Sequence, residues 1–250
     1  MKNPSNKKTI TAVVILILVG VFGWLVIRNK LAVAPVQVVP PVDKAVILEP
    51  IDKEITETGD LYEISIHYPY YNNTVIDTEI KKYIDNAHDE FVKSFIPSDP
   101  VLKEMFTNGN KGFLTITYEI KKSPNGLTTV FHGSQFTGGA HPTPFIFTVP
   151  VDNKGTLLQL ADVFSVSTPE YLTVLSVYAS RILNNQYGDR FFKEGADTNP
   201  ENWNHWYIDE NGNLVILFGA YQVAPYVEGE PEVIIPFSEI EGIVKPEYFK

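Results

Sequence analysis

The chain is predicted to reverse direction at the stretch Gly133-Ser134-Gln135-Phe136-Thr137-Gly138-Gly139-Ala140-His141-Pro142. Residues 127–136 and residues 145–151 on either side of it read as β-strands. Gly138 and Gly139 can adopt the positive φ angles that tight turns require. We therefore expect this stretch to be the turn between two neighbouring antiparallel strands.

A helix is expected to pack on the sheet that contains these strands. Residues 113–121 alternate between apolar and polar and add a third strand, and residues 61–68 show the same half-buried period. Between them, apolar side chains in residues 76–95 recur at helical spacing, with Thr74 placed to cap the helix. The range 55–143 is thus predicted to be one helix-on-antiparallel-sheet half.

The remaining residues, 144–250, are predicted to form a second half with a helix packed on an antiparallel sheet. Thr168-Pro169-Glu170 combines a capping residue with proline at the first helical position, and Gly188 is a natural stop for that helix. Alternation near residues 214–218 and a short run at residues 232–236 indicate a small antiparallel sheet. The predicted fold class is α+β, with two helix-on-antiparallel-sheet halves.

The first fifty residues have a different character. Residues 9–27 carry no charge over nineteen positions, which as a helix is long enough to cross a hydrocarbon core of about 30 Å. An uncleaved transmembrane helix is favoured over a cleaved signal peptide, although Ala32-Val33-Ala34 resembles a cleavage site. The lysines of residues 1–8 place that end in the cytoplasm. The Pro-rich residues 28–54 are expected to form a stalk that displays the folded part outside the membrane.

Composition excludes several classes of function. The formal net charge is −10, and five of the 20 basic residues precede residue 31, so the region after the span is strongly acidic. Such a surface repels nucleic acid, and no nucleic-acid partner is predicted. The absence of cysteine removes disulfides, thiolate nucleophiles and thiolate metal sites.

No motif points to a cofactor, a metal or a set of catalytic residues. His132 and His141 have no third ligand at zinc-like spacing. Residues 209–213 begin like a calcium loop, but Leu214 replaces the required glycine, so a hairpin turn is predicted. The acidic residues near Glu228 leave open an alternative, a hydrolase with paired carboxylates.

Aromatic residues are dense in the second half. Trp206 is expected to be buried, whereas Tyr221 and Tyr226 could be either core residues or exposed platforms for a sugar ring or a protein partner. His141, held extended before Pro142, could likewise face a ligand or bond to a neighbouring carbonyl group.

Two segments carry a resemblance to a known family. Thr137-Gly138-Gly139-Ala140-His141, followed later by residues 218–229 (FGAYQVAPYVEG), resembles a bacterial family of uncharacterised extracytoplasmic domains. That family includes the outer domain of a lysozyme-sensing anti-sigma factor, which the second half resembles. It also includes the non-catalytic N-terminal part of a peptidoglycan deacetylase, which the first half resembles. The resemblance covers residues 55–250.

The resemblance implies a non-catalytic module on the outer face of a bacterial membrane, with peptidoglycan or a wall-active protein as partner. Neither named activity is expected here, because no deacetylase catalytic domain follows up to Lys250 and residues 1–8 are too few to hold a sigma factor. A scaffold without a ligand of its own is a third hypothesis.

We expect five residues to form the binding site of such a module and to lie on one side of the fold. They come from the central turn and from the 218–229 segment: Gly138, Gly139, His141, Tyr221 and Tyr226.

Overall fold

The computed structural model describes residues 49–95, 104–106 and 110–250. The predicted transmembrane helix at residues 9–27 and most of the predicted stalk lie outside this range. Within the described residues, none of the helices combines the length and apolar character that a membrane crossing requires.

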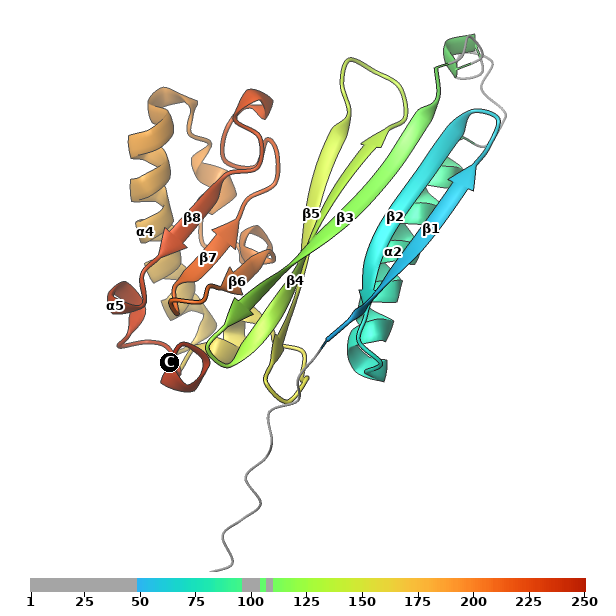
Figure 1. Cartoon of the computed structure of the whole chain (residues 1–250). Coiled ribbons are helices and arrows are strands. Elements are labelled where there is room, and N and C mark those ends of the chain that lie inside the picture. The colour runs from blue at the N-terminus through green and yellow to red at the C-terminus, as the bar shows by residue number, and fades with distance from the viewer. Residues whose placement is uncertain (1–48, 96–103, 107–109) are drawn as a thin grey trace, which may run out of the picture. The chain divides into compact units, whose positions relative to one another are not determined.

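Five strands form the first sheet, and they lie in chain order (Figure 1). They are β1 (Ile51–Thr58), β2 (Tyr62–Tyr70), β3 (Gly112–Ser123), β4 (Gly126–Phe136) and β5 (Thr143–Asp152). The first four residues of β1 fall within the predicted stalk, and β5 extends the sheet beyond residue 143. The sequence-based expectation of a helix-plus-sheet fold with two sheets is confirmed.

The prediction of a purely antiparallel first sheet is wrong, because β2 and β3 run parallel. Helix α2 (Thr74–Lys93) lies between these two strands in the chain. A helical crossover returns the chain to the end of the sheet where it started, so the strand that follows runs in the same direction as the one before. The other neighbouring pairs of this sheet are antiparallel.

The N-terminus of α2 is fixed by side chains that bond to its free backbone N–H groups. Asn73, rather than the predicted Thr74, is the cap, and its side-chain oxygen accepts from the N–H groups of Val75 and Ile76. Asp77 accepts from the N–H groups of Tyr71 and Asn73. These bonds satisfy groups that have no partner within the helix.

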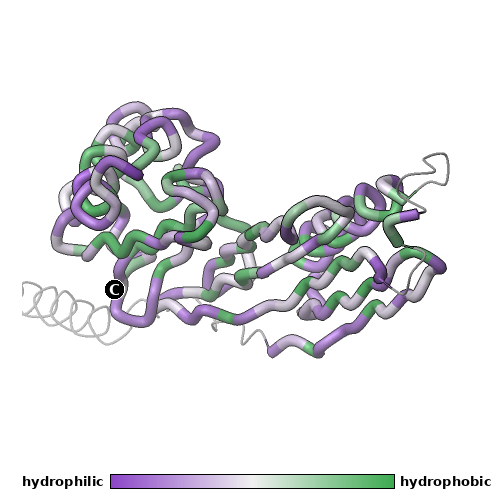
Figure 2. The backbone as a smooth tube through the Cα atoms, turned by 90° about the horizontal axis from the view of Figure 1, so that it is seen from above, coloured by the Kyte–Doolittle hydropathy of each residue, from purple (hydrophilic) through white to green (hydrophobic). Residues whose placement is uncertain are grey.

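One face of α2 packs on the first sheet. Ile76, Ile80, Ile84 and Phe91 are buried against strand residues that include Phe131 and Phe147. Figure 2 shows hydrophobic positions alternating with hydrophilic ones along the strands, as expected where the two faces of a sheet have different surroundings.

The second sheet is antiparallel and small, as predicted. It contains β6 (Trp206–Ile208), β7 (Leu214–Leu217) and β8 (Glu232–Ile235). The turn between β6 and β7 is the predicted hairpin, because Asp209 Oδ1 accepts from the backbone N–H groups of Asn211 and Asn213.

Helix α4 (Thr168–Tyr187) packs on the second sheet and ends at Gly188, which has a φ of 57°. Leu172, Leu175, Ala179 and Leu183 are its buried contacts with that core. Short helices complete this half: η1 (Leu160–Val163), η2 (Gly188–Arg190), η3 (Lys193–Ala196), η4 (Pro200–Trp203), η5 (Tyr226–Glu228), α5 (Phe237–Ile240) and η6 (Pro246–Tyr248).

The second sheet packs on the face of β4 and β5 that points away from α2. Val130 and Ile146 lie on this face and form a small core with Tyr207, Val215 and Leu217. Burial raises the pKa of Tyr207 to about 12, so its phenol is neutral in the interface between the two sheets. β4 and β5 are therefore covered on both faces, which places the turn between them beside the second half.

Candidate functional site

The central turn has the backbone geometry that its glycines predict. Gly138 and Gly139 adopt φ angles of 104° and 115°. A Cβ at Gly138 would lie 2.9 Å from the sulfur of Met105, whereas a Cβ at Gly139 would meet nothing within 4 Å. Both glycines are thus favoured by their φ angles, whereas the contact at Gly138 is with the end of a flexible, exposed side chain that can move aside.

The turn presents His141 to the ring of Tyr226. The two rings stack with centroids 3.9 Å apart and planes inclined by 26°. His141 Nδ1 lies 2.9 Å from the carbonyl oxygen of Pro142, and the Tyr226 hydroxyl donates to the same oxygen at 2.9 Å. His141 donates to this carbonyl in the tautomer that carries its proton on Nδ1. Both side chains are fixed by one backbone group.

Tyr221 completes the cluster from a strained position. Its φ is 67°, which is uncommon for a bulky residue, and its side chain is 56% exposed. The Tyr221 oxygen lies 3.5 Å from His141 Nε2, and its ring centroid is 5.5 Å from that of Tyr226. We call His141, Tyr221 and Tyr226 the aromatic surface. The expectation that the two segments lie together is confirmed.

Gln222 holds the backbone that carries Tyr221. Its side-chain oxygen accepts from the N–H of Gly219, and its amide nitrogen donates to the carbonyl oxygens of Gly195 and Asn202, each at 3.0 Å. Val223 and Ala224, which follow, are buried. Sequence reasoning missed Gln222, because bonds to distant backbone groups leave no periodic signal in a sequence.

The acidic residues near Glu228 are engaged with basic partners. Glu228 pairs with Arg190. Glu230 lies 3.7 Å from His132, whose other ring nitrogen is 3.4 Å from Glu119. Within the described ranges, no three His, Asp or Glu side chains gather in a way that could hold a metal ion.

The pKa values of two histidines near Glu230 are shifted in opposite directions. The nearby carboxylate of Glu230, supported by the hydrogen-bonded Glu119, raises the pKa of His132 against the effect of burial. Burial lowers the pKa of His205, and the charge of Glu230 opposes that change. Nδ1 of His205 and Oε1 of Glu230 are both buried without a hydrogen-bond partner in the described structure.

The raised pKa of His132 predicts a pH-dependent contribution to stability. Such a contribution is fully present below the unfolded-state pKa of about 6.5 and is lost as pH rises through the folded-state value. His132→Gln should therefore destabilise the protein more at pH 5.5 than at pH 9. The measurement is urea unfolding of wild type and variant at both pH values, where the contribution of His205 cancels.

A matched background separates this contribution from other effects of the substitution. In a Glu230→Gln protein, the effect of His132→Gln on the pH dependence of stability should shrink, because the carboxylate that most favours the protonated histidine is gone. An equal loss of stability at both pH values in the original background would contradict the prediction.

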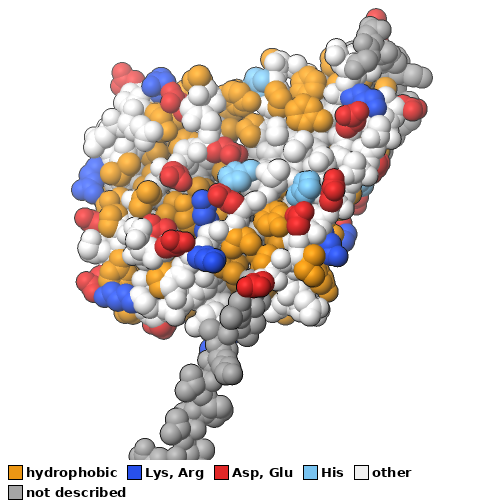
Figure 3. Space-filling view, in the orientation of Figure 1, with side chains coloured by type: hydrophobic (Ala, Val, Ile, Leu, Met, Phe, Trp, Pro, Cys, Tyr) orange, Lys and Arg blue, Asp and Glu red, His pale blue; other side chains and the backbone are white. Residues whose placement is uncertain are grey.

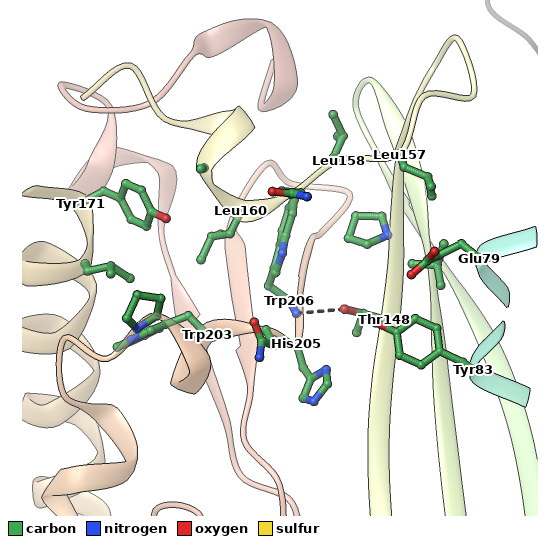
Figure 4. A pocket seen from close by; sticks show the side chains of 17 residues that line it. Glu79, Tyr83, Thr148, Leu157, Leu158, Leu160, Tyr171, Trp203, His205 and Trp206 are labelled. Atoms are coloured by element: carbon green, nitrogen blue, oxygen red, sulfur yellow. Dashed lines mark hydrogen bonds between the residues drawn. The ribbon is translucent and has the colours of Figure 1, made fainter. Parts of the chain in front are cut away.

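A second feature, which the sequence did not indicate, is a cleft of about 730 Å³ between the halves (Figure 4). The second half contributes Leu160, Tyr171, Trp203 and Trp206 to one wall. Across from them lie Thr148 of β5 and two side chains of α2, Glu79 and Tyr83. The backbone N–H of Trp206 donates to the Thr148 hydroxyl at 3.3 Å and ties the two walls together. Trp206 is buried, as predicted.

Known proteins match both halves. Residues 55–143 match the family model described as "Deacetylase PdaC", and residues 161–238 match "Protein of unknown function (DUF3298)". A curated relative, the peptidoglycan-N-acetylmuramic acid deacetylase PdaC of Bacillus subtilis (strain 168), is 26% identical over 200 residues, which cover 78% of this chain and 41% of the relative. The chain thus spans about two fifths of the length of that relative.

Two solved structures share the fold. A DUF3298 family protein of Pseudomonas aeruginosa PAO1 superposes with a TM-score of 0.55 at 18% identity, over 82% of this chain and 98% of that one. A DUF3298 member of Bacteroides fragilis NCTC 9343 gives a TM-score of 0.58 at 17% identity, over 80% and 95%. Residues 161–238 therefore match a DUF3298 family domain, and residues 55–143 match a domain of the kind that the deacetylase PdaC carries.

Proposed function

We propose that this chain is a binding or sensing module of the bacterial cell envelope, anchored by residues 9–27 and acting by recognition of a wall component or a wall-active protein. The relationship to a peptidoglycan deacetylase supports a role at the cell wall. The membrane span and stalk predicted from the sequence would display the folded part outside the membrane.

The observation that carries this proposal is the exposed aromatic surface. Tyr221 keeps a large side chain at a φ of 67°, where glycine would be free of strain, and leaves 56% of it exposed. An exposed ring contributes little to the core, so packing of this side chain does not offset the backbone strain. Strained residues that the surrounding structure holds in place are concentrated at binding sites. Val227, 81% exposed, extends the apolar area beside it.

The surroundings of this surface suit contact with a large partner. Figure 3 shows hydrophobic side chains interspersed with acidic and basic ones over the face in view, a mixed surface of the kind that protein interfaces present. His141 and Tyr226 are already fixed by Pro142, so little side-chain entropy is lost when a partner binds.

The hydrolase alternative has less support. Paired carboxylates in a glycoside hydrolase must be available to a substrate and a water molecule. Here Glu228 is engaged by Arg190, and Glu230 lies against His132 with one oxygen buried. Geometry thus favours recognition over hydrolysis.

Tyr221→Gly tests the proposal directly. It should reduce co-sedimentation of the full-length protein with purified peptidoglycan by about tenfold. The free energy of unfolding should stay within about 1 kcal/mol of wild type, because relief of the positive φ offsets the entropy that glycine adds to the unfolded chain. The measurements are the bound fraction at several protein concentrations and a urea unfolding curve.

His141→Ala should also weaken binding, with a stability change of about 0.5 kcal/mol or less if the histidine is a surface contact. A loss of roughly 1–3 kcal/mol would instead identify a buried hydrogen-bonding brace. Val177→Ala, at an exposed position of α4, is the control that should alter neither property. Unchanged binding by both site variants would exclude the aromatic surface, and release of soluble fragments by wild type would favour the hydrolase.

A further inference from the structure

The cleft between the halves has the size and the position of a ligand site. Its volume of about 730 Å³ falls within the range of small-molecule pockets, and it lies where two parts of a fold meet. The cleft runs along β5, the edge strand of the first sheet. Helix α2 lies on one side of it and the second half on the other. Neither family description names a ligand for it.

Tyr83 provides a rigid aromatic platform at this cleft. Its ring stacks on the buried ring of Phe147, with centroids 4.5 Å apart and planes inclined by 18°. The Tyr83 side chain nevertheless remains 38% exposed. A ring that is held from behind and open in front can pack against the C–H face of a sugar without first losing conformational freedom.

Hydrogen-bonding groups are distributed around this platform. Glu79 lies one helical turn before Tyr83 on α2 and supplies acceptor oxygens, with Lys82 as its only ion-pair partner among the described residues, at 3.9 Å. On the opposite side, the exposed amide of Asn204 makes no hydrogen bond in the described structure. Carboxylate and amide groups together can accept from and donate to neighbouring hydroxyl groups.

The charge of the cleft selects against anionic ligands. Its lining contains a glutamate and neither lysine nor arginine, in a chain with a formal net charge of −10. A phosphate, a nucleotide or an acidic saccharide would have no cationic partner there. Leu157, Leu158 and Trp206 add apolar surface, which suits a ligand that presents both methyl and hydroxyl groups.

We propose that this cleft binds an uncharged saccharide of two or three rings, with one ring packed on Tyr83 and hydroxyl or acetamido groups bonded to Glu79 and Asn204. This site is separate from the aromatic surface. It goes beyond the proposed function, because it requires no contact at Tyr221 and stands if that surface binds nothing.

Titration calorimetry of the full-length protein with N,N′,N″-triacetylchitotriose tests the proposal. A detergent without a sugar headgroup is needed, since a glycoside detergent would compete for the site. We expect saturable binding below about 10 mM ligand, and at least tenfold weaker binding of trigalacturonate, an anionic trisaccharide. The absence of binding to the first probe, or equal binding of both, would overturn the proposal.

Variants at matched positions locate the site. Tyr83→Ala should weaken binding of the chitotriose by at least tenfold, whereas Tyr83→Phe, which keeps the ring, should stay within about threefold. Tyr70→Ala is the control, because Tyr70 is 37% exposed and lies outside this cleft. Tyr221→Gly should bind the probe like wild type, which keeps this test independent of the aromatic surface.

Asn204→Ala provides a second test of where the saccharide binds if the Tyr83→Ala protein is unstable. It removes only an exposed amide, so melting should be unchanged while the affinity for the probe falls by about threefold or more. If the Tyr83 or Asn204 variants that fold bind as tightly as the Tyr70 control, the saccharide is not held in this cleft.

Discussion

Trp203→Ala is expected to lower the free energy of unfolding by about 3–5 kcal/mol, the usual range for a fully buried tryptophan. The Trp203 side chain is 1% exposed, and its indole ring meets the ring of Phe218 edge to face at 5.9 Å. Its Nε1 donates to the carbonyl oxygen of Asp197 at 2.9 Å, so the substitution leaves that acceptor unpaired in addition to creating a cavity. The measurement is equilibrium unfolding in urea.

Two control variants separate packing from hydrogen bonding. Trp203→Phe keeps an aromatic ring but removes the N–H group, and should cost clearly less than the alanine variant. Val177→Ala, at a position that is 68% exposed, should change the free energy of unfolding by about 0.5 kcal/mol or less. A loss below about 1 kcal/mol for Trp203→Ala would contradict the burial of this residue, because collapse of the site could not recover so much.

The elements that the sequence predicted best are those with local signals. Helix α4 begins at Thr168 and ends before Gly188, because proline in the first turn and glycine at the end act within a few residues of the chain. The hairpin turn at Asp209 is local in the same sense, since its side chain bonds to the backbone two and four residues later.

Elements that depend on distant partners could not be predicted in full. The alternation in β2 and β3 is the same whether the strands run parallel or antiparallel, so their direction follows from the α2 crossover. β1 is an edge strand whose side chains are mostly exposed, and it therefore lacks the hydrophobic alternation that identifies strands. For this reason the sequence pattern places residues 51–54 in the predicted stalk rather than in a strand.

Some features of the candidate site could likewise be predicted from local sequence, whereas others depend on contacts between distant residues. The turn glycines and the nearness of His141 to Tyr226 could be anticipated, because two recognisable segments carry them. The shared bond to the Pro142 carbonyl, the Gln222 contacts and the cleft at β5 arise only when the halves pack together. Sequence periodicity reports which face of an element is buried, and not what that face meets.

Gly195→Ala should disrupt the aromatic surface from a distance. A Cβ at Gly195 would lie 1.8 Å from the carbonyl oxygen of Gln222 and 2.6 Å from its carbonyl carbon. Since both are backbone atoms, the clash cannot be relieved by a change of rotamer, and the segment that carries Tyr221 must move. We expect a loss of about 1–3 kcal/mol in the free energy of unfolding, as for other overpacked sites. Peptidoglycan co-sedimentation should fall by about tenfold.

Two substitutions complete this test. Gly242→Ala is the matched control, because a Cβ there would meet nothing within 4 Å, and it should preserve both stability and binding. Gln222→Ala removes the clamp on Gly195 and Asn202 without introducing a clash, so it should weaken binding by loosening Tyr221 rather than by displacing it. A Gly195→Ala protein that binds peptidoglycan like wild type would mean that the position of Tyr221 does not matter for recognition. In that case the strain at Tyr221 would need another explanation, and the proposed role of the aromatic surface would be wrong.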